Sequence, residues 1–510
     1  MCKRILVALS LSVGLSLGLL LLLASPSIVA LADGAILYVA PGADCGAATP
    51  CYGSVQAAVD GASNGDAIKI AGGTYSGVHN VPTLTTDVFT ATQVVVVTKS
   101  VTIQGGYALA DWTTSDPEAH PTILDARGQG RVLCIIGECS PTIEGLRISG
   151  GDASGLGGIS WGDVGGGVYI NGAAGLISDT RIYSNTAEGG GGLFLLNSST
   201  EIQGGYVNGN SALGNVGGGL CIQYSSAILE HSTITNNTSD VWGGGIYVGG
   251  SAPRLTGNVI RNNSVTGYGF GGGVALSGTA AVLQSNLIAD NTASASGGGL
   301  YLWDSDATLD GDIVRHNHAG SFGGGVYIHG KAPRVVNGVV MSNSVSSTSG
   351  FGAGIYAEYA APRLTHLTIA GNSGGHGSAI HVTVPGSGDL GTILVTNTIV
   401  ADHEVGISVM EGCTATLRGT LWHDNSAKWS GEGTIDHTFD RQGDPAFDAD
   451  GYHLTSLSLA IDRGVGPGTM PDLDGDARPI GPGVDIGADE FSGTPIAWQQ
   501  LHLPLIMFTR

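Results

Sequence analysis

The stretch GGGIYVGGSAPRLTGNVIRNN, from Gly243 to Asn263, decides the fold, because variants of it recur along the middle of the chain. Each variant opens with a glycine triplet, or with GAG in the last one, and successive openings lie 25 to 29 residues apart. A fixed period of this length indicates a repeat architecture in which each repeat is one supersecondary unit. The units open at Gly165, Gly190, Gly217, Gly243, Gly271, Gly297, Gly323 and Gly352.

Three further positions keep their spacing inside every unit. In the quoted stretch they are Leu255, twelve residues after the first glycine, Ile260, five residues later, and Asn263, three residues later again. All length variation falls between the asparagine and the next glycine, so one edge of the repeat takes the insertions. The asparagines are Asn185, Asn210, Asn237, Asn263, Asn291, Asn317, Asn343 and Asn372.

Short runs of β-branched and aromatic residues, punctuated by glycine, serine and asparagine, favour strands over helices. Parallel strands stacked coil on coil, about 4.8 Å apart, bury Val, Ile and Leu along one axis. We therefore predict an all-β protein, a right-handed parallel β-helix of roughly 11–13 coils. Equivalent asparagines would then stack, so that each amide hydrogen-bonds the next, and we interpret their column as an internal structural ladder.

The glycine-led strand of most units carries an aromatic residue at a position that points away from the core. Stacked coils would align these residues as an outward stripe beside the variable turn, and we predict that the stripe offers a platform for sugar rings. The alternative is that neighbouring rings pack on one another and shield the sheet. The stripe consists of Tyr169, Phe194, Tyr247, Tyr301, Tyr327, Tyr356 and His381.

Residues 1–32 have the features of a secretory signal, because Lys3 and Arg4 precede an apolar run and a small-residue cleavage site. We expect a secreted or cell-surface protein, with an uncleaved membrane anchor as the alternative. The apolar tail at residues 496–510 is too short to cross a membrane. It is predicted to be a final strand or a sorting tail.

Removing Lys3 and Arg4 with the signal changes the formal net charge from −22 to −24. This charge disfavours nucleic acid and anionic membrane surfaces as partners. An acidic polysaccharide would also be repelled unless Ca²⁺ bridged it to the protein.

Close cysteines in an exported protein favour disulfides. Cys45 with Cys51 and Cys134 with Cys139 are such pairs, and both are predicted to be bonded. Cys221 is interpreted as an isolated thiol.

An N-terminal region precedes the repeats, and in its stretch CYGSVQAAVDGASNGDAIKI Ser54 can cap a short helix that ends near Ala62. Together with LDARGQGRV at Leu124–Val132 and the glycine-led coils, this region resembles secreted bacterial right-handed β-helix proteins of the pectin-lyase-like superfamily. The resemblance implies a β-helix over residues 33–442, including a helical N-terminal cap.

Residues 443–495 contain GDPAFDADGYHLTSLSLAIDRG and DLDGDARPIGPGVDIGADEF. They look like the C-terminal segment of many such bacterial surface proteins, sometimes called the choice-of-anchor Q region. The resemblance implies an irregular segment that caps or presents the helix and does not catalyse.

The repeat weakens after Gly377, yet a five-residue step between apolar positions persists. This step predicts that Ile399 and Trp422 point into the core. Three residues after each of them, Asp402 and Asn425 are predicted to stand in the asparagine column.

Two groups of side chains suggest chemistry. Asp472, Asp474 and Asp476 alternate as at the start of an oxygen-rich Ca²⁺ loop, so a structural calcium is one prediction, with a salt-bridged turn as the alternative. No other cofactor is expected. A small acid–base cluster is a further hypothesis, because histidines one coil apart have carboxylates alongside. Its members are His376, Asp402, His403 and Glu404.

We therefore predict a secreted, non-catalytic β-helix protein that binds glycans or cell-envelope partners through the stripe and the adjacent variable turns. The first alternative is a polysaccharide lyase or glycoside hydrolase of the pectin-lyase-like superfamily. Neither the acidic run from Asp304 to Asp312 nor Arg334 with Arg363 matches a catalytic motif of that superfamily. The second alternative is a purely structural envelope component.

Overall fold

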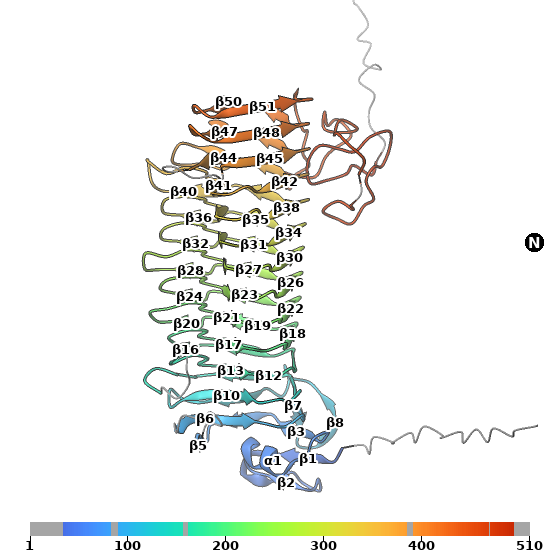
Figure 1. The fold of residues 1–510 in the computed structure, drawn as a ribbon. Coiled ribbons are helices and arrows are strands. Elements are labelled where there is room, and N and C mark those ends of the chain that lie inside the picture. The colour runs from blue at the N-terminus through green and yellow to red at the C-terminus, as the bar shows by residue number, and fades with distance from the viewer. Residues whose placement is uncertain (1–33, 83–89, 157–161, 385–390, 469, 494–510) are drawn as a thin grey trace, which may run out of the picture.

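The computed structural model describes residues 34–82, 90–156, 162–384, 391–468 and 470–493. The predicted signal at residues 1–32 and the apolar tail at 496–510 lie outside them. Figure 1 shows a column of stacked coils, from β1 (Ile36–Val39) near the blue end to β50 (Ala427–Ser430) at the orange end. The predicted all-β solenoid is confirmed, with about 11 turns.

Each regular coil consists of three short strands and a two-residue fourth. In the coil of the quoted stretch they are β25 (Ile246–Gly249), β26 (Arg254–Thr256), β27 (Val259–Arg261) and β28 (Ser264–Val265). All four pair in parallel with the next coil, so that Leu255 lies opposite Leu283 and Ile260 opposite Ile288. We call the sheets that contain β25, β26 and β27 the first, second and third sheets.

The interior of the column is one continuous apolar cluster. Inward residues such as Leu255 and Ile260 are fully buried in it. Burial of one such side chain contributes about 1.5–3 kcal/mol, so repeated layers stabilise the fold without a large helical content. The fixed spacing in the sequence follows from this packing, because a one-residue shift would turn the apolar side chains outward.

A short helix shields the first layer of the core, as the sequence predicted. Helix α1 (Val55–Gly61) follows Ser54, whose hydroxyl accepts a hydrogen bond from the Ala57 N–H at 3.2 Å. Val55 and Val59 are buried in the main core, and Figure 1 places α1 beside β1. None of the described helices has the length and apolar character that crossing a membrane requires.

The asparagine column forms the predicted ladder. Asn263 Nδ2 donates to Asn291 Oδ1 at 3.0 Å, and the same oxygen accepts from the Asn263 N–H at 2.9 Å. Asn263 Nδ2 also donates to the Ile234 carbonyl at 2.9 Å. The buried amides are therefore satisfied from within and need no ligand. The bonds run through Asn185, Asn210, Asn237, Asn263, Asn291, Asn317, Asn343 and Asn372.

A second, shorter ladder has no counterpart in the predictions. Asn258 donates to Asn286 at 2.9 Å, and Asn286 donates to Asp312 Oδ1 at 2.8 Å. Burial raises the pKa of Asp312 to about 7. Its Oδ2 has no hydrogen-bond partner among the described residues. This ladder therefore ends in a carboxyl group where an amide would be better satisfied.

The last coils differ from the prediction by one residue. In the third sheet, β46 (Ile399–Ala401) places Val400 opposite Ile369 of the preceding coil. Val400 therefore points into the main core, and Ile399 points outward. Trp422, in β49 (Leu421–His423), is 1% exposed in the core, which confirms its predicted position.

His403 takes the ladder position that the prediction gave to Asp402. Its Nε2 accepts from the Asn372 N–H and Nδ2 at 3.3 and 3.2 Å, and its Nδ1 faces Asn425 Oδ1 at 3.3 Å. These partners assign the ring proton to Nδ1. Burial lowers the pKa of His403 to about 4, so the ring is neutral at physiological pH.

The C-terminal segment, which was predicted to cap or present the helix, lies along the side of the last coils. It follows β52 (Arg441–Gln442), and Figure 1 shows it in red beside the upper coils. Its residues Leu454 and Ile486 pack against Ile399 and Leu421 of the third sheet. The outward positions of these coils are apolar because the segment covers them, which is why the register was predicted one residue off.

One of the two predicted disulfides is formed. Cys45 and Cys51 are bonded, whereas Cys134 and Cys139 are free. Cys134 packs on the outer side of the first sheet with Tyr169, but Cys139 belongs to the main core. The two thiols therefore lie on opposite sides of the sheet despite their closeness in sequence.

Candidate functional site

The aromatic stripe is buried, so the prediction of an exposed sugar platform is wrong. Tyr301 is 2% and Tyr356 6% exposed, and their rings lie 4.9 and 5.1 Å from the ring of Tyr327 between them. Tyr169, Phe194, Tyr327 and His381 are buried as well, and Tyr247 is half-buried.

The variable turn is what covers the stripe. Rings that stand just before the glycines fold back over the first sheet and pack on the tyrosines, as where Phe270 lies 4.8 Å from Tyr301. The alternative interpretation, in which neighbouring rings shield the sheet, matches this arrangement. Burial raises the pKa of Tyr169 to about 12 and lowers the pKa of His381 to about 4, so both are neutral near pH 7.

More accessible rings lie two residues further along the same strands. Trp303 ends β33 (Leu300–Trp303) and His329 ends β37 (Val326–His329), and both are half-buried. Their ring centres are 3.8 Å apart with planes tilted by 4°, so they stack face to face along the column. This pair shows no periodic signal in the sequence, because neighbouring coils carry Ser277 and Glu358 at that position.

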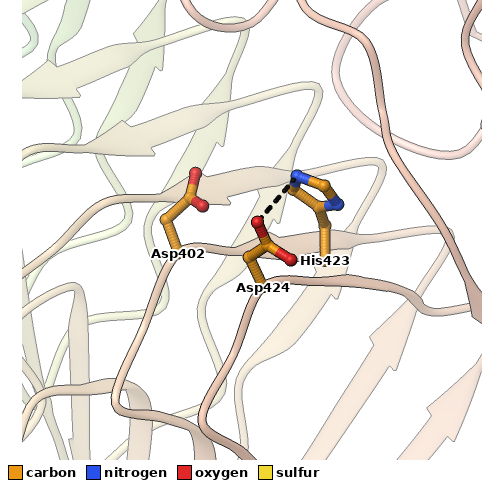
Figure 2. Close-up of side chains that lie close together, drawn as sticks. All are labelled: Asp402, His423 and Asp424. Atoms are coloured by element: carbon orange, nitrogen blue, oxygen red, sulfur yellow. Dashed lines mark ion pairs between the residues drawn. The ribbon is translucent and has the colours of Figure 1, made fainter.

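Three side chains converge on the outer surface of the last coils (Figure 2). Asp402 follows β46 and Asp424 follows β49, so the carboxylates occupy equivalent positions on adjacent coils, with the ring of His423 beside Asp424. Ligand atoms of the three lie within 4.8 Å of one another. His423 Nε2 is 3.6 Å from Asp424 and 3.8 Å from Asp444.

Electrostatics in this group favour proton sharing. Burial, together with the nearby carboxylates Asp424 and Asp444, raises the pKa of Asp402, although His423 opposes the shift. Two carboxylates beside an imidazole can transfer a proton, and the same oxygen and nitrogen ligands could hold a divalent cation.

The predicted cluster of His376, Asp402, His403 and Glu404 is not formed. His403 is buried in the ladder, His376 stacks on Phe351 at 4.6 Å, and Asp402 lies beside His423 instead. His423 and Asp424 were not among the predicted residues, because Asp402 and Asp424 occupy equivalent positions only in the observed register.

A groove of about 700 Å³ lies on the second sheet at the C-terminal coils. Its floor is formed by β45 (Thr392–Thr396), β48 (Thr414–Arg418) and β51 (Thr434–Thr438), and residues Val465 and Gly466 of the C-terminal segment form a wall. Polar groups and one ring line it: Thr396, Thr416, Thr438, Arg418, Asp436 and Phe439.

Two residues give this groove its chemical character. Phe439 is 66% exposed, which is unusual for a large apolar ring. Arg418 is exposed, and the ion pairs of the described chain do not include it. In a protein of net charge −22, a guanidinium outside these ion pairs can pair with an anionic group.

The predicted calcium loop is a turn held by its own backbone. Asp472 Oδ1 accepts from the N–H groups of Asp474 and Asp476 at 2.9 and 2.8 Å, and its Oδ2 accepts from the Glu490 N–H at 2.8 Å. Asp474 is hydrogen-bonded to His453 Nε2 at 2.7 Å. The carboxylates of Asp472 and Asp474 thus serve different partners, and calcium binding stays a prediction.

A family model described as the right handed beta helix region matches residues 131–313 and 260–422. These matches span more than half of the 510 residues, so the chain belongs to the right-handed β-helix family. The handedness predicted from the sequence agrees with this family. No curated protein matches the chain.

Solved structures with a similar fold act on polysaccharides according to their names. Pectate lyase Pel9A is 13% identical over 90% of this chain and 96% of its own, with a TM-score of 0.35. The periplasmic alginate epimerase AlgG is 10% identical over 67% and 78%, with a TM-score of 0.35. The GH87 α-1,3-glucanase from Streptomyces thermodiastaticus strain HF3-3 is 14% identical over 80% and 69%, with a TM-score of 0.37. At these identities and scores, none lends a functional residue to this chain.

Proposed function

We propose that the protein is an exported surface β-helix that binds an acidic polysaccharide in the groove of the second sheet. One observation carries the proposal: an exposed Phe439 and an unpaired Arg418 stand in one groove of about 700 Å³. That volume lies within the range of about 300–1,000 Å³ found for small-molecule sites. Export itself rests on the sequence of residues 1–32.

The groove supplies the three kinds of contact that an acidic sugar needs. The face of Phe439 can pack on the apolar face of a pyranose ring. Arg418 can pair with a sugar carboxylate, which compensates for the repulsion by the acidic protein. Threonine hydroxyls and Asp436 can exchange hydrogen bonds with the sugar hydroxyls. The binding surface thus lies on a rigid sheet with one wall supplied by the C-terminal segment.

Binding of oligogalacturonate, measured by calorimetry, tests the proposal. We expect Phe439→Ala and Arg418→Ala each to weaken binding at least about tenfold, a loss near 1.4 kcal/mol. Tyr206→Ala is the matched control, because Tyr206 is 38% exposed in β19 (Tyr206–Asn208), away from the groove. Undiminished binding by both groove variants would refute the proposal.

The group around His423 favours a second candidate function, cleavage of a polysaccharide. Its two carboxylates lie on adjacent coils within 4.8 Å. Retaining glycosidases use two close carboxyl groups, about 5–5.5 Å apart, one as nucleophile and one as acid, and two carboxylates on adjacent coils could take these roles. The raised pKa of Asp402 suits the acid.

Incubation with neutral and uronate polysaccharides, with and without Ca²⁺, tests this second function. New reducing ends that disappear in Asp424→Asn would establish it. Absence of new reducing or unsaturated ends with the wild-type protein would leave binding as the function.

A further inference from the structure

Two further arginines extend the positive charge of the groove along the second sheet. Arg334 opens β38 (Arg334–Val336), and Arg363 opens the adjacent strand β42 (Arg363–Thr365). The two residues are paired in the register, so their backbones lie one coil rise, about 4.8 Å, apart. Both are exposed, and neither takes part in an ion pair among the residues that the structure describes.

A row of outward positions leads from these arginines into the groove. Arg363 is paired with Leu394 on β45, and Leu394 is paired with Thr416 on β48. Thr416 lines the groove, and Arg418 follows two residues later on the same face of the strand. Arg334 and Arg418 are therefore three coils apart, about 14 Å along the column axis. We call the three arginines, with Leu394 and Thr416 between them, the arginine track.

The track is positive in a protein that is acidic as a whole. The strands β38, β42, β45 and β48 carry three arginines and neither aspartate nor glutamate. The whole chain, in contrast, has 20 Lys and Arg against 42 Asp and Glu. An acidic ligand that most of the surface repels is therefore attracted to this face.

The C-terminal segment borders the track as well as the groove. Val465 and Gly466 form the groove wall, and further along the segment Met470 Sδ lies 3.1 Å from Arg334 Nη2. The segment thus reaches the coil of β38, as its course beside the upper coils in Figure 1 indicates. A thioether is a weak acceptor for one of the five guanidinium N–H groups, so Arg334 can still bind an anion.

We propose that the acidic polysaccharide continues out of the groove along the arginine track, so that its chain runs parallel to the column axis. This proposal rests on the function proposed above and extends it to a site for several uronates. Each guanidinium can form a bidentate pair with one carboxylate, so no bridging Ca²⁺ is needed. Leu394 offers apolar surface to a sugar ring between Arg363 and Thr416.

Calorimetry with digalacturonate and hexagalacturonate in EDTA tests the track. The dimer is short enough to occupy the groove alone, whereas the hexamer can also reach Arg363 and Arg334. We expect the wild-type protein to bind the hexamer at least about tenfold more tightly than the dimer. The double variant Arg334→Ala/Arg363→Ala should lose this gain and bind the dimer as the wild type does. Both arginines are exposed, and thermal unfolding verifies that the variant folds.

Arg254→Ala is the matched control for the double variant. Arg254 opens β26 at the same register position of the second sheet, and it is exposed. It lies three coils beyond Arg334, on the side away from the groove. Its removal deletes the same kind of charge from the same sheet, and it should change the affinity for the hexamer less than about twofold.

Arg418→Ala separates the track from the groove. If Arg418→Ala weakens binding of both oligomers while the double variant binds the hexamer with wild-type affinity, the groove stands and the track is overturned. The track is also overturned if Arg254→Ala weakens hexamer binding as much as the double variant does, or if the hexamer binds only when Ca²⁺ is added. Absence of binding by either oligomer refutes the proposed function and the track with it.

Discussion

The regular coils and the last coils of the column are built differently, although both follow the same backbone path. On the outer side of the third sheet, Tyr206 is 38% exposed, whereas Ile399 and Leu421, at equivalent positions, are fully buried under the C-terminal segment. On this outer side the regular coils face solvent, whereas the last coils are covered by the C-terminal segment.

The hydrogen-bonded column shows the same contrast. Asparagines occupy every rung through Asn372, and then His403 takes the next rung, where one ring nitrogen accepts from Asn372 and the other donates to Asn425. Coil stacking thus requires matched hydrogen bonds at this position and not one particular side chain. Packing against the outer face of the third sheet can change while the hydrogen bonds of this column are kept.

Removing one rung should produce the largest difference between the two regions. Asn291→Ala leaves several buried groups unsatisfied at about 1–3 kcal/mol each, so we expect a loss of about 4 kcal/mol in the free energy of unfolding. Asn425→Ala, at a half-buried rung near the end, should cost about 1 kcal/mol. Urea unfolding measures the loss of stability in both variants. Equal losses would contradict the expectation that a fully buried rung contributes more than a half-buried one.

Detaching the C-terminal segment should have the next largest effect. Leu421→Asp places a charge in the cluster with Leu454 and Ile486, and we expect a local loss of about 3 kcal/mol. Limited proteolysis should cut residues 443–493 at least about tenfold faster, while the coils stay resistant. Tyr206→Asp is the matched control at the equivalent exposed position. If Tyr206→Asp accelerates cleavage of residues 443–493 as much as Leu421→Asp does, the contact between Leu421 and the segment is not responsible.

Asp312→Asn should stabilise a regular coil. Burial raises the pKa of Asp312 to about 7. The contribution of this carboxyl group to the stability of the wild-type protein is therefore complete below about pH 4, and it is lost as the pH rises through 7. The variant should be about 2 kcal/mol more stable at pH 8 and nearly unchanged at pH 4. Thermal unfolding at the two values checks this, and a pH-independent difference would rule out titration as the cause.

The smallest effect is expected at His453 in the C-terminal segment. Burial alone would lower its pKa, but hydrogen bonds to Asp450 and Asp474 raise it to about 9. The charged ring stabilises the segment fully below about pH 6.5, and that contribution is lost as the pH rises through 9. Hydrogen exchange of the segment should therefore speed up from pH 7 to pH 10 more in the wild type than in His453→Gln, after correction for intrinsic rates.

The repeat period predicted the solenoid, the ladder and the inward position of Trp422, because coil stacking converts sequence spacing directly into register. It could not predict which outward residues would be covered. Trp242 lies against Tyr301, and Leu454 packs near Leu421, through contacts between segments far apart in the chain. The candidate sites depend on such contacts, since Val465 meets the groove only after the C-terminal segment folds back.

The ladder also gives the column an electrical direction. Each amide donates to the next amide toward the C-terminal end, from Asn185 Nδ2 to Asn210 Oδ1 and onward to Asn372, whose donors meet His403 Nε2, while a second bond from each Nδ2 goes back to a carbonyl of the preceding coil. The side-chain dipoles are therefore parallel, and hydrogen bonds in such a chain polarise one another. A coil that folds onto the growing C-terminal end meets waiting donors and must offer an acceptor. A coil added at the opposite end meets an acceptor and must offer a donor, so the two ends of a stack of coils are chemically different.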